Sequence, residues 1–262
     1  MAAVGALVGC GEVPVPEVQV TAGEYAFTAL ASIGGGAVRF KLLNSGKEDH
    51  HLQLARLNEG VTLANLQTAL AGPKPDQALA LVSLPGGGGT VLPGGSASAV
   101  FELTAGRHIL ACFVPSADGV PHIAKGMVLP VTVAAPTGQA AKLPQPSAEA
   151  VLKDFVFELP ELKAGKTAVK VINRGPQPHE LSILRLAAGK TAADVLAFFQ
   201  QPPSGPPLFQ SAGGVNGLSA RVTVVGELEL TAGAYLAICL IPDPASGVPH
   251  AALGMVKEFA DK

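Results

Sequence analysis

Alternating hydrophobic and polar positions run through both halves of the chain and predict short β-strands. Residues 37–44, AVRFKLLN, and residues 167–173, TAVKVIN, alternate in this way, and each stretch leads into an Asn-x-Gly turn signal. Residues 107–114 and 235–241 are instead continuous apolar runs, which is typical of central strands buried on both faces. Further strands are predicted at residues 51–57, 98–104, 126–133, 180–186, 221–231 and 254–260. The pattern favours an all-β fold.

One short helix is predicted in each half, at residues 60–71 and 190–201. Thr62 and Thr191 stand where an N-cap is expected, and Asp194 occupies the capping-box position of the second helix. The proline-rich segments GPKP and QPPSGPP follow the two helices and are expected to end them.

Two glycine-containing stretches interrupt the strand pattern. Gly226 lies inside residues 221–231 and predicts a bulge or a turn. Residues 85–95, PGGGGTVLPGG, lack the lysine and the following helix of a phosphate-binding loop. We therefore interpret this stretch as a flexible excursion.

The second half of the chain repeats the first. LTAGRHILACFVP, residues 103–115, matches LTAGAYLAICLIP, residues 230–242, and GVPHIAKGM matches GVPHAALGM. A period this long is a domain duplication and not a solenoid repeat. The predicted parts are an N-terminal signal remnant and tether (1–15), a first domain (16–134), a linker rich in Pro, Ala and Gln (135–148) and a second domain (149–262).

Composition supports this fold class and excludes some partners. The chain has 262 residues, of which 48% are hydrophobic and 15% charged, with 31 Gly, 22 Pro and no Trp, a mixture that suits many short elements joined by turns. The net charge is −2, and the basic residues form no cluster, so nucleic acid and anionic lipid surfaces are not expected partners.

Cys10 predicts a lipid anchor. The chain has three cysteines, an odd number that does not suggest a disulfide framework. LVGC, residues 7–10, resembles the lipobox of bacterial lipoproteins, which implies that Cys10 is acylated and that the protein lies in the bacterial cell envelope, touching the membrane only through this anchor. The alternative is an incidental cysteine in an ordinary apolar N-terminus.

A Cys, a His and a Met recur in the same order in both halves, each time with a further His upstream. Each residue alone would suit ordinary packing. The combination of a thiolate, imidazoles and a thioether is the donor set that suits copper in both oxidation states.

These residues resemble the ligand stretches of the cupredoxins, the blue copper proteins. NRGPQPHELSIL looks like the first ligand strand of that family, and LTAGAYLAICLIP followed by GVPHAALGMV looks like the second. The resemblance implies two tandem Greek-key β-sandwiches, each with one short helix and one type 1 copper site, the second site being favoured over the first. The implied ligands are His50, Cys112, His122, Met127, His179, Cys239, His250 and Met255.

The chain also departs from the family pattern. Nine residues separate Cys112 from His122 and ten separate Cys239 from His250, more than in small blue copper carriers. His51 and Glu180 follow the first histidines, where the family often has Asn. We interpret His51 and His108 as non-ligand residues, although His51 adjoins His50 and could take its place.

Three functions are compatible with these features. The first is an envelope-anchored copper protein that passes single electrons to a redox protein partner. The second is a copper-free cupredoxin-like binding or structural module of the envelope. The third is an enzyme related to copper nitrite reductases or multicopper oxidases; the resemblance implies that such enzymes need further His ligands, usually in His-x-His pairs, and the chain has none. We expect the first function and a protein that is not an enzyme. The redox partner and the oligomeric state are not specified by the sequence.

Overall fold

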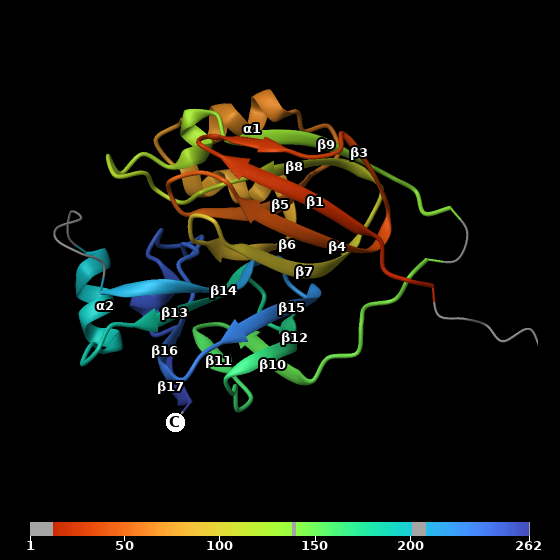
Figure 1. Ribbon diagram of the computed structural model, residues 1–262. Helices are drawn as coiled ribbons and strands as arrows, with labels where there is room; N and C mark the ends of the chain where they lie inside the picture. The colour runs from red at the N-terminus through yellow and green to blue at the C-terminus, as the bar shows by residue number, and fades with distance from the viewer. Residues whose placement is uncertain (1–12, 138–139, 201–207, 262) are drawn as a thin grey trace, which may run out of the picture.

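The computed structural model describes residues 13–137, 140–200 and 208–261 and is built mainly of β-strands (Figure 1). Cys10 lies outside the described residues, as does the whole proline-rich stretch QPPSGPP, residues 201–207, after the second helix. The first half contains β1 (Glu17–Gly23), β2 (Ala26–Thr28), β3 (Ser32–Gly34), β4 (Gly36–Asn44), β5 (His50–Leu57), α1 (Leu63–Leu70), η1 (Pro75–Leu81), β6 (Val82–Val91), β7 (Ser96–Leu103), β8 (Gly106–Ala111), η2 (His122–Lys125) and β9 (Val128–Ala134). The second half contains β10 (Ala148–Lys153), β11 (Val156–Glu158), β12 (Gly165–Asn173), β13 (His179–Leu186), α2 (Ala192–Phe199), β14 (Phe209–Leu218), β15 (Thr223–Leu230), β16 (Gly233–Ile238), η3 (His250–Leu253) and β17 (Val256–Asp261).

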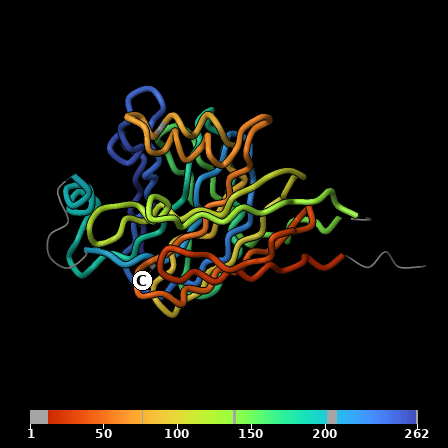
Figure 2. Tube along the Cα trace, turned by 90° about the horizontal axis from the view of Figure 1, so that it is seen from above, coloured from red at the N-terminus to blue at the C-terminus, as the bar shows by residue number. Residues whose placement is uncertain are grey.

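Two sheets pass through both halves. One has the order β11-β10-β12-β15-β7-β4-β1-β2, and the other has the order β17-β16-β13-β14-β6-β5-β8-β9-β3. The halves join where equivalent strands meet, β15 against β7 and β14 against β6, both antiparallel. Apart from the additional β3, each sheet is therefore symmetric about the junction, and Figures 1 and 2 show the halves side by side. The predicted class, an all-β fold of two tandem β-sandwiches with one short helix each, is confirmed.

The hydrophobic core is continuous across the junction. One cluster of buried side chains contains residues of both halves, among them Phe40, Phe101, Ile183 and Tyr235. Hydrogen bonds also link the two halves across the junction. The Asn216 side-chain amide donates to the backbone carbonyls of Leu52 and Gly88, at 3.1 and 2.8 Å. The two halves pack as equivalent subunits of a symmetric dimer do.

The glycine-rich stretch at residues 85–95 is not an excursion, so this interpretation was wrong. Most of it belongs to β6, an inner strand that pairs with β5 and with β14 of the other half. A Cβ atom on Gly87 would lie 2.0 Å from the carbonyl oxygen of Leu52, and one on Gly89 would lie 2.4 Å from the carbonyl carbon of Gly213. Glycine is required at position 87 because the β5 backbone of the same half lies so close, and at position 89 because the backbone of the other half does.

The glycine at position 226 also has a packing role instead of the predicted bulge or turn. Strand β15 pairs with β12 without interruption from Thr223 to Leu230. A Cβ atom on Gly226 would lie 2.7 Å from Cγ2 of Val215, on β14 of the facing sheet. The missing side chain lets the two sheets pack closely.

Both predicted helices are present and begin where their caps predict. Thr62 and Thr191 are the N-caps of α1 and α2, and each forms a capping box, with Asn65 and Asp194 as its partners. The described residues between β9 and β10 contain no helix or strand, and the predicted domain boundaries stay a prediction. In the described parts of the chain, no helix has the length and hydrophobicity needed to cross a membrane.

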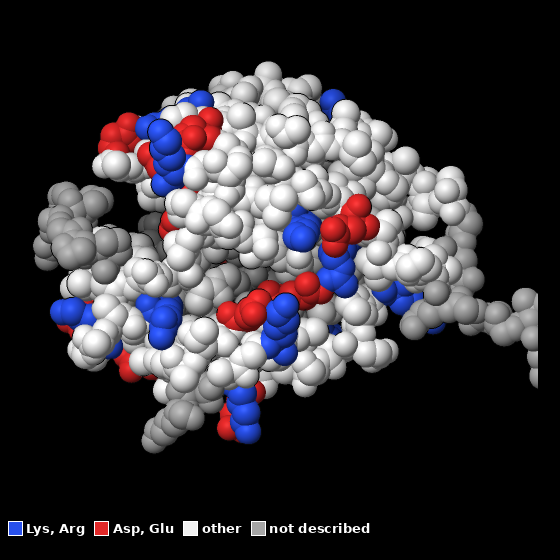
Figure 3. Space-filling view, viewed as in Figure 1, with Lys and Arg blue, Asp and Glu red and all other residues white. Residues whose placement is uncertain are grey.

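Charged side chains are few on the face that Figure 3 shows, and both signs lie close together. An ion pair between Arg39 of β4 and Glu227 of β15 links the two halves. No extended surface of one charge is visible on this face, as the composition predicts.

Candidate metal centres

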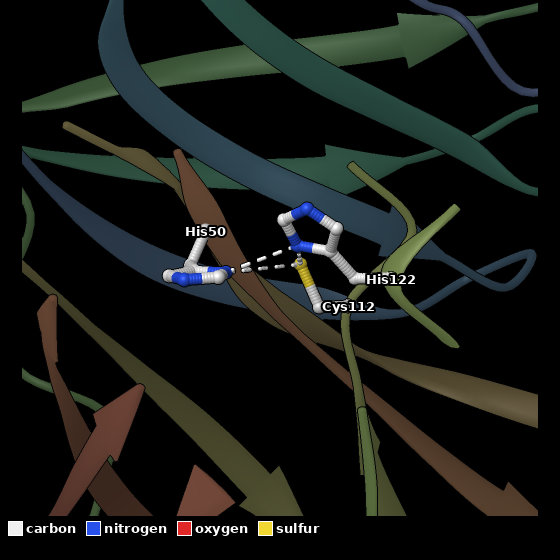
Figure 4. A group of neighbouring side chains, drawn as sticks. All are labelled: His50, Cys112 and His122. Carbon is white, nitrogen blue, oxygen red and sulfur yellow. Dashed lines mark hydrogen bonds between the residues drawn. The ribbon is translucent and has the colours of Figure 1, made fainter. Parts of the chain in front are cut away.

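In the first half, three buried side chains from separate elements meet at one end of the sandwich. His50 begins β5, Cys112 follows β8 and His122 begins η2, and Figure 4 shows the three side chains converging. The Nδ1 atoms of His50 and His122 lie 3.1 Å apart, and the Cys112 Sγ atom lies 4.0 and 3.5 Å from them. All three side chains are fully buried. We call this set the first-half group.

The second half contains the same arrangement. His179 begins β13, Cys239 follows β16 and His250 begins η3, and their ligand atoms lie within 4.8 Å of one another. The Nδ1 atoms of His179 and His250 are 3.1 Å apart, and Cys239 Sγ lies 3.4 Å from the Nδ1 atom of His250. This second-half group is fully buried as well. The structure therefore brings together six of the eight predicted ligands as two triads.

The backbone around each cysteine explains how a long loop still holds its histidine in place. The amide of Cys112 donates to the carbonyl of Met127, and the amide of Met127 donates to the carbonyl of His122, at 3.2 and 2.9 Å. Pro115 and Pro121 form a β-bridge, so the residues between Cys112 and His122 fold back as a hairpin. The extra loop length relative to small blue copper carriers is therefore taken up in this hairpin.

The second half repeats this backbone pattern. The amide of Cys239 donates to the carbonyl of Met255, and the amide of Met255 donates to the carbonyl of His250, at 3.2 and 2.9 Å. Pro242 and Pro249 form the corresponding bridge. Met127 and Met255 are fully buried within the same core cluster as the two cysteines, and their role as ligands stays a prediction.

His51 and Glu180 hold the cysteine strands and lie outside the two triads. The backbone amide of His51 points at the Cys112 sulfur, at 3.4 Å, while its Nε2 atom accepts a hydrogen bond from the amide of Phe113, at 2.8 Å. Glu180 does the same for Cys239 and for Leu240 in the second half, at 3.4 and 2.8 Å. The two residues thus tie the start of the first ligand strand to the cysteine segment in each half. His108 lies elsewhere, near the carbonyl of Gly106.

Burial disfavours the charged form of several of these side chains when no metal is bound. It lowers the pKa of His50 and His179, and burial together with the charge of His179 lowers the pKa of His250 to about 4. Burial also raises the pKa of the Cys112 thiol to about 11. Since thiolate is the form that binds a metal, binding must release the thiol proton and become weaker at low pH.

The geometry of the first-half group fits a single metal ion. For atoms separated by 3.1, 3.5 and 4.0 Å, the point equidistant from all three lies about 2 Å from each, close to usual metal–imidazole and metal–thiolate lengths. Two imidazoles and one thiolate form the trigonal set that is typical of blue copper sites. The residues therefore fit copper, with His50, Cys112 and His122 holding it in the first half and His179, Cys239 and His250 in the second.

Three polar residues beside the triads were missed in the sequence. Glu48 Oε2 lies 2.7 Å from the Nε2 atom of His122, and Asp154 Oδ1 lies 2.8 Å from the Nε2 atom of His179. Gln177 Oε1 lies 3.2 Å from the Nε2 atom of His250. Glu48 and Gln177 occupy the same position of the repeat, two residues before the first histidine, and this regularity was the available signal.

The carboxyl group of Glu180 supplies a prediction about pH. Burial raises its pKa to about 7 from an ordinary value of 4.5, and it lines a cavity of about 940 Å³ between the halves whose walls are largely apolar. The unfolded chain ionises this group at a lower pH than the folded chain, so its contribution to stability falls as pH rises from 4.5 to 7. Glu180→Gln keeps an oxygen that can accept from Leu240 and should stabilise the fold by about 1–2 kcal/mol more at pH 8 than at pH 5.

Urea unfolding of the metal-free protein at the two pH values measures this difference. Glu161→Gln, at a side chain that is 81% exposed, is the control and should give no difference between the two pH values. Equal effects of Glu180→Gln at pH 5 and pH 8 would show that Glu180 does not titrate in this range.

Comparison with known proteins finds matches among solved structures alone. No protein-family model and no curated protein matches the chain. An auracyanin from Roseiflexus castenholzii matches at 22% identity over 45% of this chain and 96% of its own, with a TM-score of 0.32. Auracyanin A from Chloroflexus aurantiacus, described as a blue copper protein, matches at 20% identity over 46% of this chain and 100% of its own, with a TM-score of 0.33.

Two further matches extend over both halves. A multicopper oxidase matches at 14% identity over 94% of this chain and 88% of its own, with a TM-score of 0.28. A copper-containing nitrite reductase from Thermus scotoductus matches at 11% identity over 94% of this chain and 61% of its own, with a TM-score of 0.27. At this similarity the matches assign no activity to the chain. The two His-Cys-His groups found in its own side chains point to copper binding.

The prediction that the protein is not an enzyme was wrong. It depended on the lack of a His-x-His pair in the sequence. Two of the structures that match 94% of the chain are named as an oxidase and a reductase, which are enzymes.

Proposed function

We propose that this protein binds copper at both groups and transfers single electrons through them. The observation that carries the proposal is the presence, in both halves, of a buried thiol beside two imidazole Nδ1 atoms that lie 3.1 Å apart. Met127 and Met255 are the proposed axial ligands. A copper ion bound there would supply one-electron chemistry, since it is stable as Cu(I) and as Cu(II).

The surrounding chain is suited to hold the ligands still. Each cysteine and each second histidine is tied by backbone hydrogen bonds to the methionine that follows, and each cysteine sulfur faces one further amide. All six triad side chains are fully buried, so water does not compete for the ligand atoms. Ligands on such a rigid frame move little when the charge of the site changes, and this favours rapid electron exchange.

Exposed apolar side chains near both groups offer a route to a redox partner. Val120 and Val248 stand two residues before the second histidines and are 40% and 36% exposed. Phe113, directly after Cys112, is also 40% exposed. We propose a protein partner that contacts these residues, because apolar contact brings it close to a ligand without a competing charge.

The copper-free module remains the second candidate, and one observation favours it. A separation of 3.1 Å between two Nδ1 atoms is also the length of an N–H···N hydrogen bond between neutral imidazoles of opposite tautomers. In that case the cysteines and methionines serve as core side chains. The two functions differ in whether the chain takes up copper with a thiolate-to-copper absorption band.

We further propose that the protein lies in the bacterial cell envelope, anchored through a lipid on Cys10. The support is the sequence LVGC at residues 7–10 and the extended, proline-containing segment that follows it. Mass spectrometry of the protein from its native membrane should show an acylated cysteine at the N-terminus. An unmodified chain with Met1 intact would contradict the anchor.

Electron transfer is tested by voltammetry of the copper-loaded protein. We expect reversible one-electron oxidation and reduction, with the thiolate-to-copper band disappearing on reduction and returning on reoxidation. Copper that is lost on reduction, or that cannot be reoxidised, would contradict the proposed function while leaving copper binding itself in place.

A further inference from the structure

The two groups differ in what holds the outer nitrogen, Nε2, of their histidines. In the second half both are held: Asp154 Oδ1 lies 2.8 Å from His179 Nε2, and Gln177 Oε1 lies 3.2 Å from His250 Nε2. The Gln177 amide also reaches Asp154, at 3.4 Å, so the two partners support each other. Both imidazoles of the second-half group are therefore fixed from outside.

In the first half one of the two is left without a partner. His122 Nε2 lies 2.7 Å from a carboxylate oxygen of Glu48. His50 Nε2 is fully buried and has no hydrogen-bond partner among the described residues. Buried polar atoms are rarely left in this state, so the difference between the halves requires an explanation.

Position 24 is where the missing partner would stand. Glu24 and Asp154 occupy the same place in matching tight turns, β1 to β2 and β10 to β11. The next residues, Tyr25 and Phe155, both have left-handed backbones, with φ of 60° and 61°. The two carboxylates are therefore equivalent in the repeat, although one side chain is a methylene longer.

A glycine leaves room for carboxylate and imidazole to meet in both halves. A Cβ atom on Gly175 would lie 2.6 Å from His179 Nε2 and 2.7 Å from Asp154 Oδ1. A Cβ atom on Gly46 would lie 2.8 Å from His50 Nε2 and 2.7 Å from Glu24 Oε1. The space is thus equally open in the first half, and an obstruction does not explain the missing contact.

The residue after each glycine explains why Asp154 contacts its histidine and Glu24 does not. In the first half this residue is Lys47, and its backbone amide donates a hydrogen bond to Glu24 Oε1. In the second half it is Pro176, which has no N–H group and cannot compete for the carboxylate of Asp154. Glu24 is held by the turn, whereas Asp154 is free to hold its histidine.

We propose that Asp154 is a positioning residue for His179 and that its contact makes copper fill the second-half group before the first. With Nδ1 turned toward the other ligands, Nε2 carries the proton and must donate it. Asp154 accepts the hydrogen bond from His179 Nε2–H and so fixes the tautomer and the ring, while the Nε2–H group of His50 has no acceptor among the described residues. Partners of this kind change metal affinity by about 10–100-fold. This inference rests on the copper function proposed above.

Single-group chains test the order of filling. Cys239→Ser leaves only the first-half group, and Cys112→Ser leaves only the second. In anaerobic competition for copper(I) with a chromophoric chelator, we expect the Cys112→Ser chain to bind about 10–100-fold more tightly than the Cys239→Ser chain. Equal affinities, or tighter binding by the first-half group, would overturn the proposal.

Exchanging the features of the two halves shows whether Asp154 is the cause. In the Cys239→Ser chain, Glu24→Asp combined with Lys47→Pro should raise the copper affinity about tenfold. If the proline impairs folding, Glu24→Asp alone is measured instead and should give part of this gain. In the Cys112→Ser chain, Asp154→Ala should lower the affinity about 10–100-fold, while Asp154→Asn, whose amide oxygen still accepts a hydrogen bond, should retain most of it. Glu161→Gln is the control and should leave both affinities unchanged.

A measurement without copper separates failure of this inference from failure of the proposed function. In the metal-free protein, the Nε2 proton of His179 should give a slowly exchanging signal in ¹⁵N-resolved NMR, present in the Asp154→Asn protein and lost in the Asp154→Ala protein. If the signal persists in both variants, the positioning role of Asp154 is overturned. If neither single-group chain develops a thiolate-to-copper band or binds copper(I), the proposed function fails and the order of filling fails with it.

Discussion

A chain in which Cys112 and Cys239 are both replaced by serine is expected to fold and to form no thiolate-to-copper bond. Serine is close in size to cysteine, so the buried core keeps its shape at a cost of about 1–3 kcal/mol for each hydroxyl that lacks a partner. The hydroxyl is not ionised near neutral pH and is a poor ligand for copper. The visible charge-transfer band should therefore be absent at every copper concentration.

Absorption spectra during a copper titration, with circular dichroism to verify folding, measure this effect. Ala99→Ser is a matched control, because it also places a hydroxyl in the buried core but on β7, a strand that supplies no ligand. This variant should keep the band at full strength. A folded double variant that still develops the band would show that the thiolates of these two cysteines are not its source.

The close packing of the inner strand β6 against β5 provides the second large effect. Gly87→Ala is expected to destabilise the fold by about 3 kcal/mol or more, because the added Cβ atom would lie 2.0 Å from the Leu52 carbonyl oxygen and would push β6 away from β5. The neighbouring residue offers a matched control: a Cβ atom on Gly88 would meet nothing within 4 Å. Gly88→Ala should change stability by less than about 1 kcal/mol.

Urea unfolding of the two variants and of the wild type decides between these expectations. Neither glycine has a positive φ, so the comparison measures space and not backbone strain. Equal stabilities for Gly87→Ala and Gly88→Ala would contradict the close packing of β6 against β5.

The ligand triads could be predicted from the sequence because the duplication shows them twice. The spacing from Asn44 to His50 and from Asn173 to His179 is the same, and so is the spacing from Thr104 to Cys112 and from Thr231 to Cys239. A coincidence is improbable when two histidines, a cysteine and a methionine keep their order in both halves. The helix caps at Thr62 and Thr191 were equally local signals and were predicted for that reason.

The junction could not be predicted, since its signal looks like that of a flexible loop. Glycines at 86–89 indicate mobility when they are considered alone, yet here they permit two backbones to approach each other. Strand β14 was missed for a related reason: its sequence, FQSAGGVNGL, is too polar and too rich in glycine for a strand pattern. Its partner in the neighbouring half supplies the packing that its own side chains do not.

Asp154, which lies against the Nε2 atom of His179, could not be predicted from the sequence either. Asp154 lies 25 positions before His179, in a turn that contains no ligand. Its importance follows from the turn geometry that brings it over Gly175, and from the missing amide at Pro176. Such contacts depend on the arrangement of three separate segments, and the pattern along one segment does not reveal them.

Copper stoichiometry is the most direct test of the central claim that both groups bind copper. The full-length, metal-free protein is titrated with copper(II) while the thiolate-to-copper absorption and the electron paramagnetic resonance signal are recorded. Two intact groups predict that the band grows until two equivalents have been added and then stops. A band that stops growing after one equivalent, or one that never develops at any copper concentration, would contradict the account.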